Sequence, residues 1–592
     1  MINIEISPKI KRRPICLNKQ AQGLNQGLDP VLARVLAARP WPNDSDAGTV
    51  LAPGLARLDS PFLLKDMDKA VARLTLALDR KECIGLETDH DCDGQTSHAV
   101  FHENLIKVFG HSPELLKSYI GHRLQEGYGL SEALCQRIIA DQPRPSLIIT
   151  ADNGSADEPR IAKLKALGID VIVTDHHEIP IEGIPKSAYA CLNPTRTDCD
   201  YPDPYVAGCF VAWLFMAAMR NAWIKQGRLP STTPHLTETL DFVAVGTVAD
   251  CVSMARSVNN RAIIQQGLNL IQAGTRPCWR ALKPSLGLGP HKLAAEDLGF
   301  KIGPLLNSDG RLSSALGSVS FLLSKTDQEA QEWIRVLEVH NHERKQIQKR
   351  IVQEGVEKAL DLLETGNHGL AIFLESGHSG VHGIAASRVK DLFGRPTVFL
   401  APKLNHKDLI TGSVRGIDHF HVREALQWVQ DQDQILLAFG GHKGAGGLTF
   451  SRDNLDKFLD YFERYCKSFL SPEALGPIIW SDGELSAHQI NLSTVELIQA
   501  LEPFGREFEA PNFEVRAEIK SIKFMGDGTH ARIGVLIENR QFSALWFNCR
   551  KKASDRFNFK PGDQVRMVFS MKNSYYNHET RLELQIQHLI KL

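Results

Sequence analysis

Short apolar runs alternate with polar clusters along the first half of the chain. The run CIGLET ends beside Asp89, SLIITA leads into DNG, and VIVT leads into DHH. Between the second and third runs, RIAKLKALGI has helical spacing. Strands that alternate with helices indicate an α/β fold with a parallel sheet, and the loops that follow parallel strands face one crevice. We therefore expect the three polar clusters to lie close together.

Three longer segments have the pattern of helices. The first presents one apolar face, which consists of Leu63, Met67, Ala70, Val71, Leu74 and Leu78. The second, Tyr205 to Met219, carries no charge, but its 15 residues fall short of the roughly 20 that span a bilayer. It therefore predicts a buried helix. The third, residues 328–365, predicts a long charged helix between two lobes.

The last part of the chain is rich in strands of alternating polarity. The segments FEVRAEIKSIKF, ARIGVLIE, QFSALWF, DQVRMVFSMK and RLELQIQHLI have the spacing of a small β-barrel, for which an OB-like barrel is the candidate. Its aromatic residues Trp546, Phe547, Tyr575 and Tyr576 either stack on nucleic-acid bases or belong to the strand core.

A chain of 592 residues is too long for a single core. Residues 1–48 are rich in Pro, Asn, Gln and Arg and weakly periodic, so we expect an N-terminal arm. A parallel-sheet catalytic domain follows at 49–327, and a connecting helix at 328–365 joins it to a smaller α/β substrate-binding domain at 366–470. The OB-like barrel occupies 471–592.

Composition narrows the possible functions only slightly. Lys+Arg total 68 and Asp+Glu 69, so the net charge is −1 and a nucleic-acid ligand would need a local basic groove. The opening stretch MINIEISPKIKRRP lacks the apolar core of a signal peptide. The 11 cysteines show no CxxC pair and no zinc-like spacing, which is typical of reduced thiols in a cytoplasmic protein.

The stretch ETDHDCDG concentrates negative charge at Asp89, Asp91 and Asp93. Like charges at this spacing repel one another, so the stretch is either a solvated acidic loop or a metal site. A calcium loop of the EF-hand type requires a glutamate about six residues after its glycine, where this chain has Val100. The sequence therefore disfavours that type of calcium site.

Further carboxylates and a histidine pair favour a metal site of another kind. Asp152 in TADNG, the DHH at 175–177 and Asp250 in VGTVAD each follow an apolar run. Carboxylates with imidazoles suit Mn²⁺ or Mg²⁺, and such a set can hold two ions about 4 Å apart for phosphoryl displacement. Taken alone, Asp152 fits an ordinary strand-to-turn role equally well.

The motifs DHDCDG, ADNG, TDHH and VGTVAD occur in the order of the four motifs of the DHH phosphoesterase superfamily. GGHKGAGG resembles the glycine-rich signature of the DHH-associated substrate domain. The segments LDSPFLLKDMDKAVARL, GRL, HSGVHGIAASRV, GRPTVFL, GSVRG and LEPFG narrow the resemblance to the bacterial members that degrade single strands. The resemblance extends from about residue 50 to residue 592.

The resemblance implies a role for each matching residue. The metal ligands are Asp89, Asp91, Asp93, Asp152, His176 and Asp250. His177 faces the scissile phosphate and stabilises or protonates the departing oxygen, while Asp175 orients the ligands. The substrate-binding set is Arg311, Arg388, Ser413, Arg415, Gly441, His442 and Gly446. Within it, Arg311, Ser413 and Arg415 resemble residues that grip a terminal 5′-phosphate, to which the planar fork of arginine is suited.

The implied activity is 5′→3′ hydrolysis of single-stranded DNA to 5′-mononucleotides, with two Mn²⁺ or Mg²⁺ ions, in DNA repair and recombination. The implied partners are single-stranded DNA and either a single-strand-binding protein or a helicase. We expect a cytoplasmic monomer with no membrane partner. One alternative is a DHH phosphodiesterase for short oligonucleotides or cyclic dinucleotides, which needs no barrel. Another is a non-catalytic scaffold, which predicts lost metal ligands, although all are present.

Three features depart from the superfamily pattern. Ser308 and Asp309 precede Gly310-Arg311 where small residues are usual, and we expect the extra carboxylate to weaken phosphate affinity. GSVRG ends in Gly416 where a serine is common, and the first 48 residues match no motif. These departures suggest a divergent branch with an altered substrate range.

Overall fold

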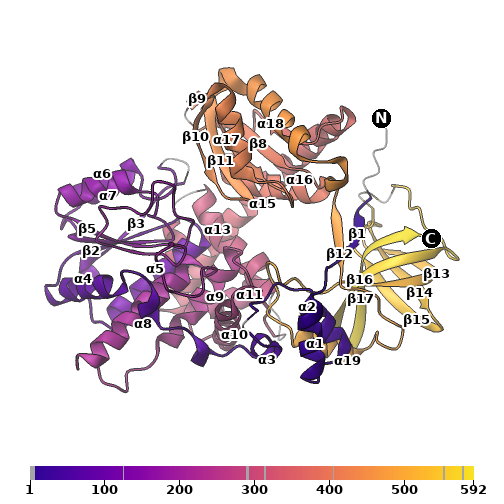
Figure 1. The fold of residues 1–592 in the computed structure, drawn as a ribbon, viewed down its shortest axis with the longest axis horizontal. Coiled ribbons are helices and arrows are strands. Elements are labelled where there is room, and N and C mark those ends of the chain that lie inside the picture. Colours follow the sequence, from indigo (N-terminus) through magenta and orange to yellow (C-terminus); the bar gives the residue numbers. More distant parts are fainter. Residues whose placement is uncertain are drawn as a thin grey trace. The chain divides into compact units, whose positions relative to one another are not determined.

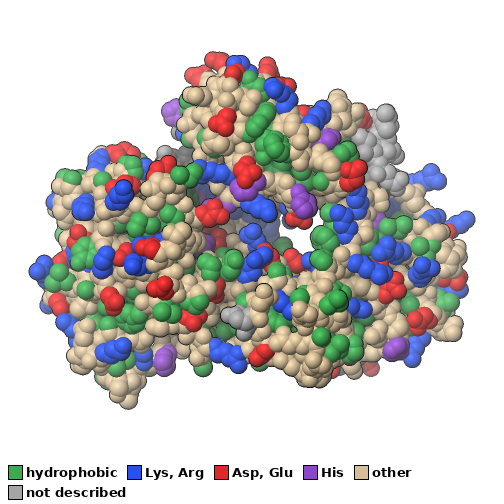
Figure 2. Space-filling model, in the orientation of Figure 1, with side chains coloured by type: hydrophobic (Ala, Val, Ile, Leu, Met, Phe, Trp, Pro, Cys, Tyr) green, Lys and Arg blue, Asp and Glu red, His purple; other side chains and the backbone are tan. Residues whose placement is uncertain are grey.

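The computed structural model describes residues 7–43, 45–123, 126–287, 292–312, 315–404, 406–550, 552, 554–576 and 579–592, with only the backbone of Leu312, Tyr575 and Tyr576. The chain forms two compact units. One contains Pro53–Leu475, and the other combines Glu5–Ala52 with Gly476–Leu592. Figure 2 shows acidic and basic side chains interspersed over the visible surface, in keeping with the net charge of −1.

The first lobe of the larger unit contains a five-stranded parallel sheet (Figure 1). The strands lie in the order β3 (Leu116–Ile120), β2 (Ile84–Thr88), β4 (Leu147–Ala151), β5 (Asp170–Thr174) and β6 (Ala190–Leu192). Every residue of β2 and β4 is buried, as expected for parallel strands covered on both faces. The register places Thr88, Ala151 and Thr174 side by side at the carboxyl edge, so the next residues begin at one edge.

The helices of this lobe are α4 (Met67–Asp79), α5 (Cys92–Lys107), α6 (Glu132–Ala140), α7 (Glu158–Ala166), α8 (Gly208–Lys225), α9 (Leu240–Ala249), α10 (Val258–Ala273), α11 (Pro277–Ser285), α12 (Ala295–Asp297), α13 (Gly303–Leu312) and α14 (Leu316–Leu322). Helix α4 buries most of its predicted face, but Leu63 precedes the helix and is 40% exposed. Helix α8 is largely buried, as predicted. Among the helices in the described ranges, none combines the length and apolar character that crossing a membrane requires.

The helix α15 (Asp327–Glu364) leads into the second lobe, as the charged pattern predicts. This lobe contains a mixed sheet in the order β10 (Leu436–Gly441), β11 (Ala445–Ser451), β9 (His406–Arg415), β8 (Thr397–Lys403) and β7 (Leu370–Phe373). Its other helices are α16 (Ser379–Phe393), α17 (Val422–Asp433) and α18 (Leu455–Phe469). Side chains of α17, α18 and the sheet form one buried cluster, which includes Phe450, Phe458 and Phe462.

The smaller unit contains the predicted OB-like barrel. Its five strands close in the order β13 (Phe513–Met525), β14 (His530–Ile537), β15 (Arg540–Trp546), β17 (Glu579–Lys591) and β16 (Gln564–Tyr576). Trp546 contacts Phe557 and Phe559 edge to face, so it belongs to an aromatic cluster. Phe547 is 42% exposed and open to a ligand. The side chains of Tyr575 and Tyr576 lie outside the described residues.

The described part of residues 1–48 differs from the expected arm. Strand β1 (Lys9–Arg12) pairs in parallel with β12 (Ile478–Ser481). The segment also forms α1 (Leu17–Asn25) and α2 (Pro30–Ala37), followed by α3 (Ala47–Leu51), and the unit adds α19 (Leu492–Gln499). The apolar residues of α2 are buried, including Val31, Leu32 and Val35. The prediction failed because the partners of β1 lie more than 400 residues away in the sequence.

A buried ion pair ties this N-terminal segment to the barrel end of the chain. Arg39 donates through Nη1 to Asp482 Oδ1 at 2.6 Å and through Nη2 to the backbone oxygen of Glu509 at 2.7 Å. The two paired side chains are 0% and 1% exposed. Without Arg39, the Asp482 carboxylate would keep only Arg13 Nε, at 3.8 Å, and the Asn512 amide, at 3.1 Å, as partners.

We expect Arg39→Met to destabilise the smaller unit by about 3 kcal/mol, the lower end for a broken buried pair, because Arg13 compensates the Asp482 carboxylate only in part. The measurement is urea unfolding of the whole chain, followed by the fluorescence transition of this unit. Arg581→Met is the matched control, because the Arg581–Glu579 pair is exposed and should contribute about 1 kcal/mol or less. Equal, small effects of both substitutions would restore the view of residues 1–48 as a loose arm.

Candidate functional site

The site begins at the carboxyl edge of the parallel sheet. Asp89, Asp152 and Asp175 directly follow β2, β4 and β5. Their backbone amides continue the hydrogen bonding of the sheet. Asp89 N donates to Ala151 O at 3.2 Å, Asp152 N to Thr174 O at 3.0 Å, and Asp175 N to Leu192 O at 3.0 Å. The predicted gathering of the three clusters is therefore what the parallel register produces.

The first aspartate loop is folded tightly against the start of α5. The Asp91 carboxylate caps this helix by accepting from Asp93 N at 2.9 Å and Gly94 N at 3.3 Å. A Cβ on Gly94 would lie 2.2 Å from the backbone oxygen of Asp89, so only glycine fits here. The glycine after the three aspartates thus allows the loop to turn back over the helix.

The Asp93 carboxylate is held by the N-terminus of another helix. Its oxygens accept from Gly208 N at 2.7 Å and Cys209 N at 2.9 Å, in the first turn of α8. Free amides at a helix N-terminus favour a negative charge. Helix α8 thereby holds Asp93 in place next to the other acidic groups.

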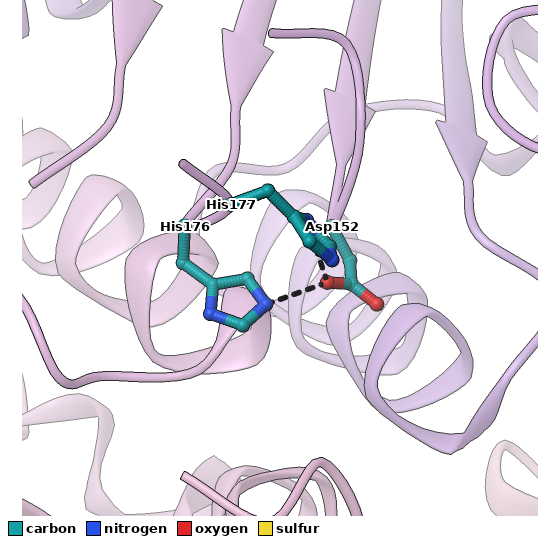
Figure 3. A group of neighbouring side chains, drawn as sticks. All are labelled: Asp152, His176 and His177. Carbon is teal, nitrogen blue, oxygen red and sulfur yellow. Dashed lines mark hydrogen bonds and ion pairs between the residues drawn. The ribbon is translucent and has the colours of Figure 1, made fainter. Parts of the chain in front are cut away.

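Two groups of three residues include all six predicted metal ligands. One consists of Asp89, Asp91 and Asp152, the other of Asp93, His176 and Asp250, and within each group one ligand atom per residue lies within 4.8 Å of the others. His176 Nε2 joins the groups, at 3.0 Å from Asp152 Oδ1 and 3.6 Å from Asp250 Oδ2. A third such group contains Asp152, His176 and His177, whose side chains point toward one another in Figure 3.

The electrostatics of the cluster fit a divalent cation. Burial, followed by the charges of Asp93 and Asp91, raises the pKa of Asp152 well above its usual value. Burial and Asp89 likewise raise the pKa of Asp91. Burial lowers the pKa of His176 to about 4, so its ring is neutral near pH 7, the form that binds metals. Carboxylates that repel one another at such short range, beside a neutral imidazole, form a site that suits Mn²⁺ or Mg²⁺.

The second histidine of the DHH motif has the opposite character. Asp175 Oδ1 accepts from His177 Nδ1 at 2.8 Å and from His176 N at 2.7 Å, while Oδ2 accepts from Ser155 N at 3.0 Å. Burial disfavours a charged ring, but the Asp175 carboxylate outweighs it and raises the pKa of His177 to about 10. His177 therefore carries a proton at neutral pH, and Asp175 orients it.

Two arginines of the predicted phosphate-binding set converge on the first turns of α16. Arg311, on α13, donates to Gly380 O at 2.9 Å. A Cβ on Gly383 would lie 2.5 Å from Arg415 Nη2, so the Arg415 guanidinium packs on that glycine. Burial and then the charge of Arg123 lower the pKa of both arginines. These positive charges lie close enough to oppose one another, an arrangement that a phosphate would stabilise.

The glycine-rich loop reaches His177 from the second lobe. Gly441 and Gly446 face each other across the β10–β11 hairpin, and Gly441 has a φ of 139°, a conformation that favours glycine. The His442 ring stacks on the His177 ring at 5.9 Å between centroids. Its Nδ1 lies 3.3 Å from the Glu178 carboxylate. Arg388 is exposed on α16. Burial is the larger cause of the lowered pKa of Arg344, and the charge of Arg388 is the smaller one. The role of Arg388 in binding stays a prediction.

Sequence reasoning missed two residues at this site. Arg123 lies beyond the end of β3, at the same edge of the sheet, and acts on the charges of Arg311 and Arg415. The Tyr128 hydroxyl donates to Asp152 O at 3.2 Å and lies 3.4 Å from His177 Nε2. The sequence contained a signal for both residues. The segment LKSYI has the pattern of a further strand, and the polar segment GHRLQEGYG follows it.

The structure explains two of the departures from the superfamily pattern. Asp309 Oδ1 lies 3.0 Å from His340 Nδ1 on α15, and Oδ2 accepts from Ser318 N at 3.1 Å. The expected weakening of phosphate affinity is not supported, because residues two apart on a helix lie on different faces and the carboxylate is used elsewhere. A Cβ on Gly416 would lie 3.1 Å from Phe420 O and from Val422, so glycine relieves close packing.

Comparison with known proteins places each part of this chain. Residues 83–247 match the family model of the DHH family N-terminal domain, residues 366–468 the DHHA1 domain, and residues 481–588 the RecJ OB domain. The Single-stranded-DNA-specific exonuclease RecJ of Haemophilus influenzae is 30% identical over 592 residues, which cover 98% of each chain.

Solved structures agree with the fold. RecJ from Thermus thermophilus, in complex with Mn²⁺, matches with a TM-score of 0.79 at 23% identity, over 99% of this chain and 79% of that one. An exonuclease RecJ bound to manganese matches with a TM-score of 0.57 at 28% identity, over 69% of this chain and 96% of that one. By its domains and by its likeness over almost the whole length to a curated relative, the chain belongs to the RecJ family of the DHH phosphoesterase superfamily.

Proposed function

We propose that the chain is a metal-dependent exonuclease that hydrolyses single-stranded DNA from the 5′ end and releases 5′-mononucleotides. The observation that carries this proposal is the pair of ligand groups at the sheet edge, beside a protonated histidine and two half-buried arginines. The RecJ relatives named as single-stranded-DNA-specific exonucleases support the substrate, and a relative bound to manganese supports the metal.

The six predicted ligands would hold the cations. Bound Mn²⁺ or Mg²⁺ supplies Lewis-acid stabilisation of the charge that develops on the phosphate oxygens. The protein supplies the acid: His177 is protonated near pH 7 and kept in place by Asp175, so it can donate a proton to the departing 3′ oxygen. His442 stacks against His177 and would confine the strand from the opposite side.

The arginines set the direction of digestion in this proposal. Water adds to the phosphorus, the bond from phosphorus to the 3′ oxygen breaks, and the shortened strand keeps a new 5′-phosphate. Arg311 and Arg415 would bind that phosphate for the next cut, through charge-assisted hydrogen bonds. A duplex end would have to unpair first, at a few kcal/mol for each base extruded, which favours single strands.

The remaining expectations stand as part of the proposal. A polymer substrate is supported by the barrel, which offers the exposed Phe547 for base stacking. None of the 11 cysteines, all of which lie in the described ranges, forms a disulfide, which supports a cytoplasmic enzyme. The helicase or single-strand-binding partner, the monomeric state and the role in repair and recombination stay predictions.

Purified chain should release mononucleotides from a single-stranded DNA labelled at either end, and release should stop in chelator and return with Mn²⁺. Asp91→Ala and His176→Ala should abolish release, since each removes a ligand. Asp391→Ala is the control, because its carboxylate is 69% exposed on α16 and should be dispensable. Full activity of both ligand variants with Mn²⁺ would refute the assigned centre.

Arg415→Ala should slow the first cut on a 5′-phosphorylated strand more than on a 5′-hydroxyl strand, by about tenfold or more. The estimate follows from the roughly 1.5–3 kcal/mol of each hydrogen bond to a charged group. Single-turnover release of the 5′-terminal nucleotide measures this difference. If both strands are slowed equally, Arg415 contacts an internal phosphate or only supports the fold.

A further inference from the structure

The two ligand groups at the sheet edge offer different ligand atoms to a cation. The first, here called the oxygen group, offers carboxylate oxygens alone and consists of Asp89, Asp91 and Asp152. The second, here called the nitrogen group, combines carboxylate oxygens with one imidazole nitrogen and consists of Asp93, His176 and Asp250. The two ions of the proposed centre would therefore be bound by chemically unlike sets of side chains.

The imidazole of His176 points its Nε2 atom at the carboxylates. This atom lies 3.6 Å from Asp250 Oδ2 and 3.7 Å from Asp93 Oδ2, within its own group. It also lies 3.0 Å from Asp152 Oδ1, in the oxygen group. The neighbouring ring of His177 is engaged elsewhere, because its Nδ1 is hydrogen-bonded at 2.8 Å to the carboxylate that orients it. His176 is thus the ring that is placed to share an ion with the nitrogen group.

The two groups also differ in negative charge. The oxygen group contains three carboxylates and the nitrogen group contains two. Within the nitrogen group, both oxygens of Asp93 already accept hydrogen bonds from backbone amides, at 2.7 and 2.9 Å. In the oxygen group, Asp91 accepts its two amide hydrogen bonds through Oδ1 alone, which leaves Oδ2 for an ion. The oxygen group therefore presents the stronger field to a hard cation.

Mg²⁺ and transition-metal ions differ in the ligand atoms that they favour. Mg²⁺ takes oxygen ligands in near-ideal octahedral geometry and gives up its waters reluctantly. Imidazole nitrogen suits first-row transition ions better than Mg²⁺, whereas carboxylates suit both Mg²⁺ and Mn²⁺. Mn²⁺ can therefore occupy either group, but Mg²⁺ should compete with it well in the oxygen group and poorly in the nitrogen group.

We propose that the centre takes two unlike ions, with a first-row transition ion such as Mn²⁺ in the nitrogen group and Mg²⁺ in the oxygen group. His176 is the selecting residue, since every other member of both groups is an aspartate. When Mg²⁺ is abundant and Mn²⁺ is scarce, the chain should hold one ion of each kind. The inference rests on the ligand assignment of the proposed function, and it does not depend on the substrate or on the direction of digestion.

The experiment counts bound Mn²⁺ by electron paramagnetic resonance, in which the sharp signal of free Mn²⁺ reports the ions that the protein has not bound. Metal-free wild-type chain receives Mn²⁺ and is then titrated with Mg²⁺. Pulsed resonance shows whether an imidazole nitrogen is a ligand of the Mn²⁺ that stays bound. The variants are His176→Gln, which replaces the ring by an amide, and Asp91→Asn, which weakens the oxygen group but keeps the α5 cap. Circular dichroism in chelator checks that both variants fold.

Wild type should bind two Mn²⁺ ions per chain. Mg²⁺ should remove one of them at a concentration about tenfold or more below that which removes the other, the scale on which changes around a metal alter its affinity. The ion that stays should show the nitrogen signal. Asp91→Asn should keep this Mg²⁺-resistant ion with its nitrogen signal and lose the other. His176→Gln should show no nitrogen signal, and Mg²⁺ should remove all of its bound Mn²⁺ over one range of concentration.

Removal of both ions by Mg²⁺ over one range of concentration in wild type would overturn the inference and leave the ligand assignment intact. A nitrogen signal or a Mg²⁺-resistant ion in His176→Gln would overturn the role given to His176. A wild type that binds fewer than two Mn²⁺ ions would contradict the ligand assignment on which the proposed function rests. The wild-type titration separates the first case from the third even if a variant fails to fold.

Discussion

The repulsion among buried carboxylates at the end of the parallel sheet is the constraint on which this structure depends. The register forces Asp89 and Asp152 to one edge, and the α5 cap adds Asp91. The protein partly relieves the cost with the amides of α8, which hold Asp93. The raised pKa of Asp152 shows that relief within the protein is incomplete. Divalent cations complete it, and the same cations make the edge useful for phosphate chemistry.

The two adjacent histidines at this edge differ in their protonation. His176 faces the carboxylates and is neutral, because burial outweighs the nearby charges. His177 turns toward Asp175 and is protonated, because that carboxylate outweighs burial. One backbone segment thus presents one neutral ring and one protonated ring, and the difference arises from which carboxylate each ring meets.

The sequence predicted most of what local pattern determines. Apolar runs that end in aspartates identified β2, β4 and β5, and the motif order identified the ligands that the structure brings together. It did not predict features that depend on distant partners. Strand β1 pairs with β12 near the other end of the chain, and buried Arg39 pairs with Asp482 from that same distant part. The role of Asp309 also required the structure, since its partner His340 lies on the long helix.

The central claim is that cations relieve the carboxylate repulsion, and Asp152→Asn tests it most directly. The raised pKa of Asp152 means that the folded, metal-free protein holds extra protons, so its stability falls as pH rises above the unfolded value, about 3.9. Asparagine tolerates the left-handed backbone at this position, where φ is 63°. Thermal unfolding at pH 8, with chelator or with Mn²⁺, is the measurement. In chelator the variant should unfold about 2–4 °C above wild type, a gain of roughly 1 kcal/mol. Mn²⁺ should raise the unfolding temperature of wild type, and it should raise that of the variant by less. A variant less stable than wild type in chelator, or a wild type that gains nothing from Mn²⁺, would contradict the account.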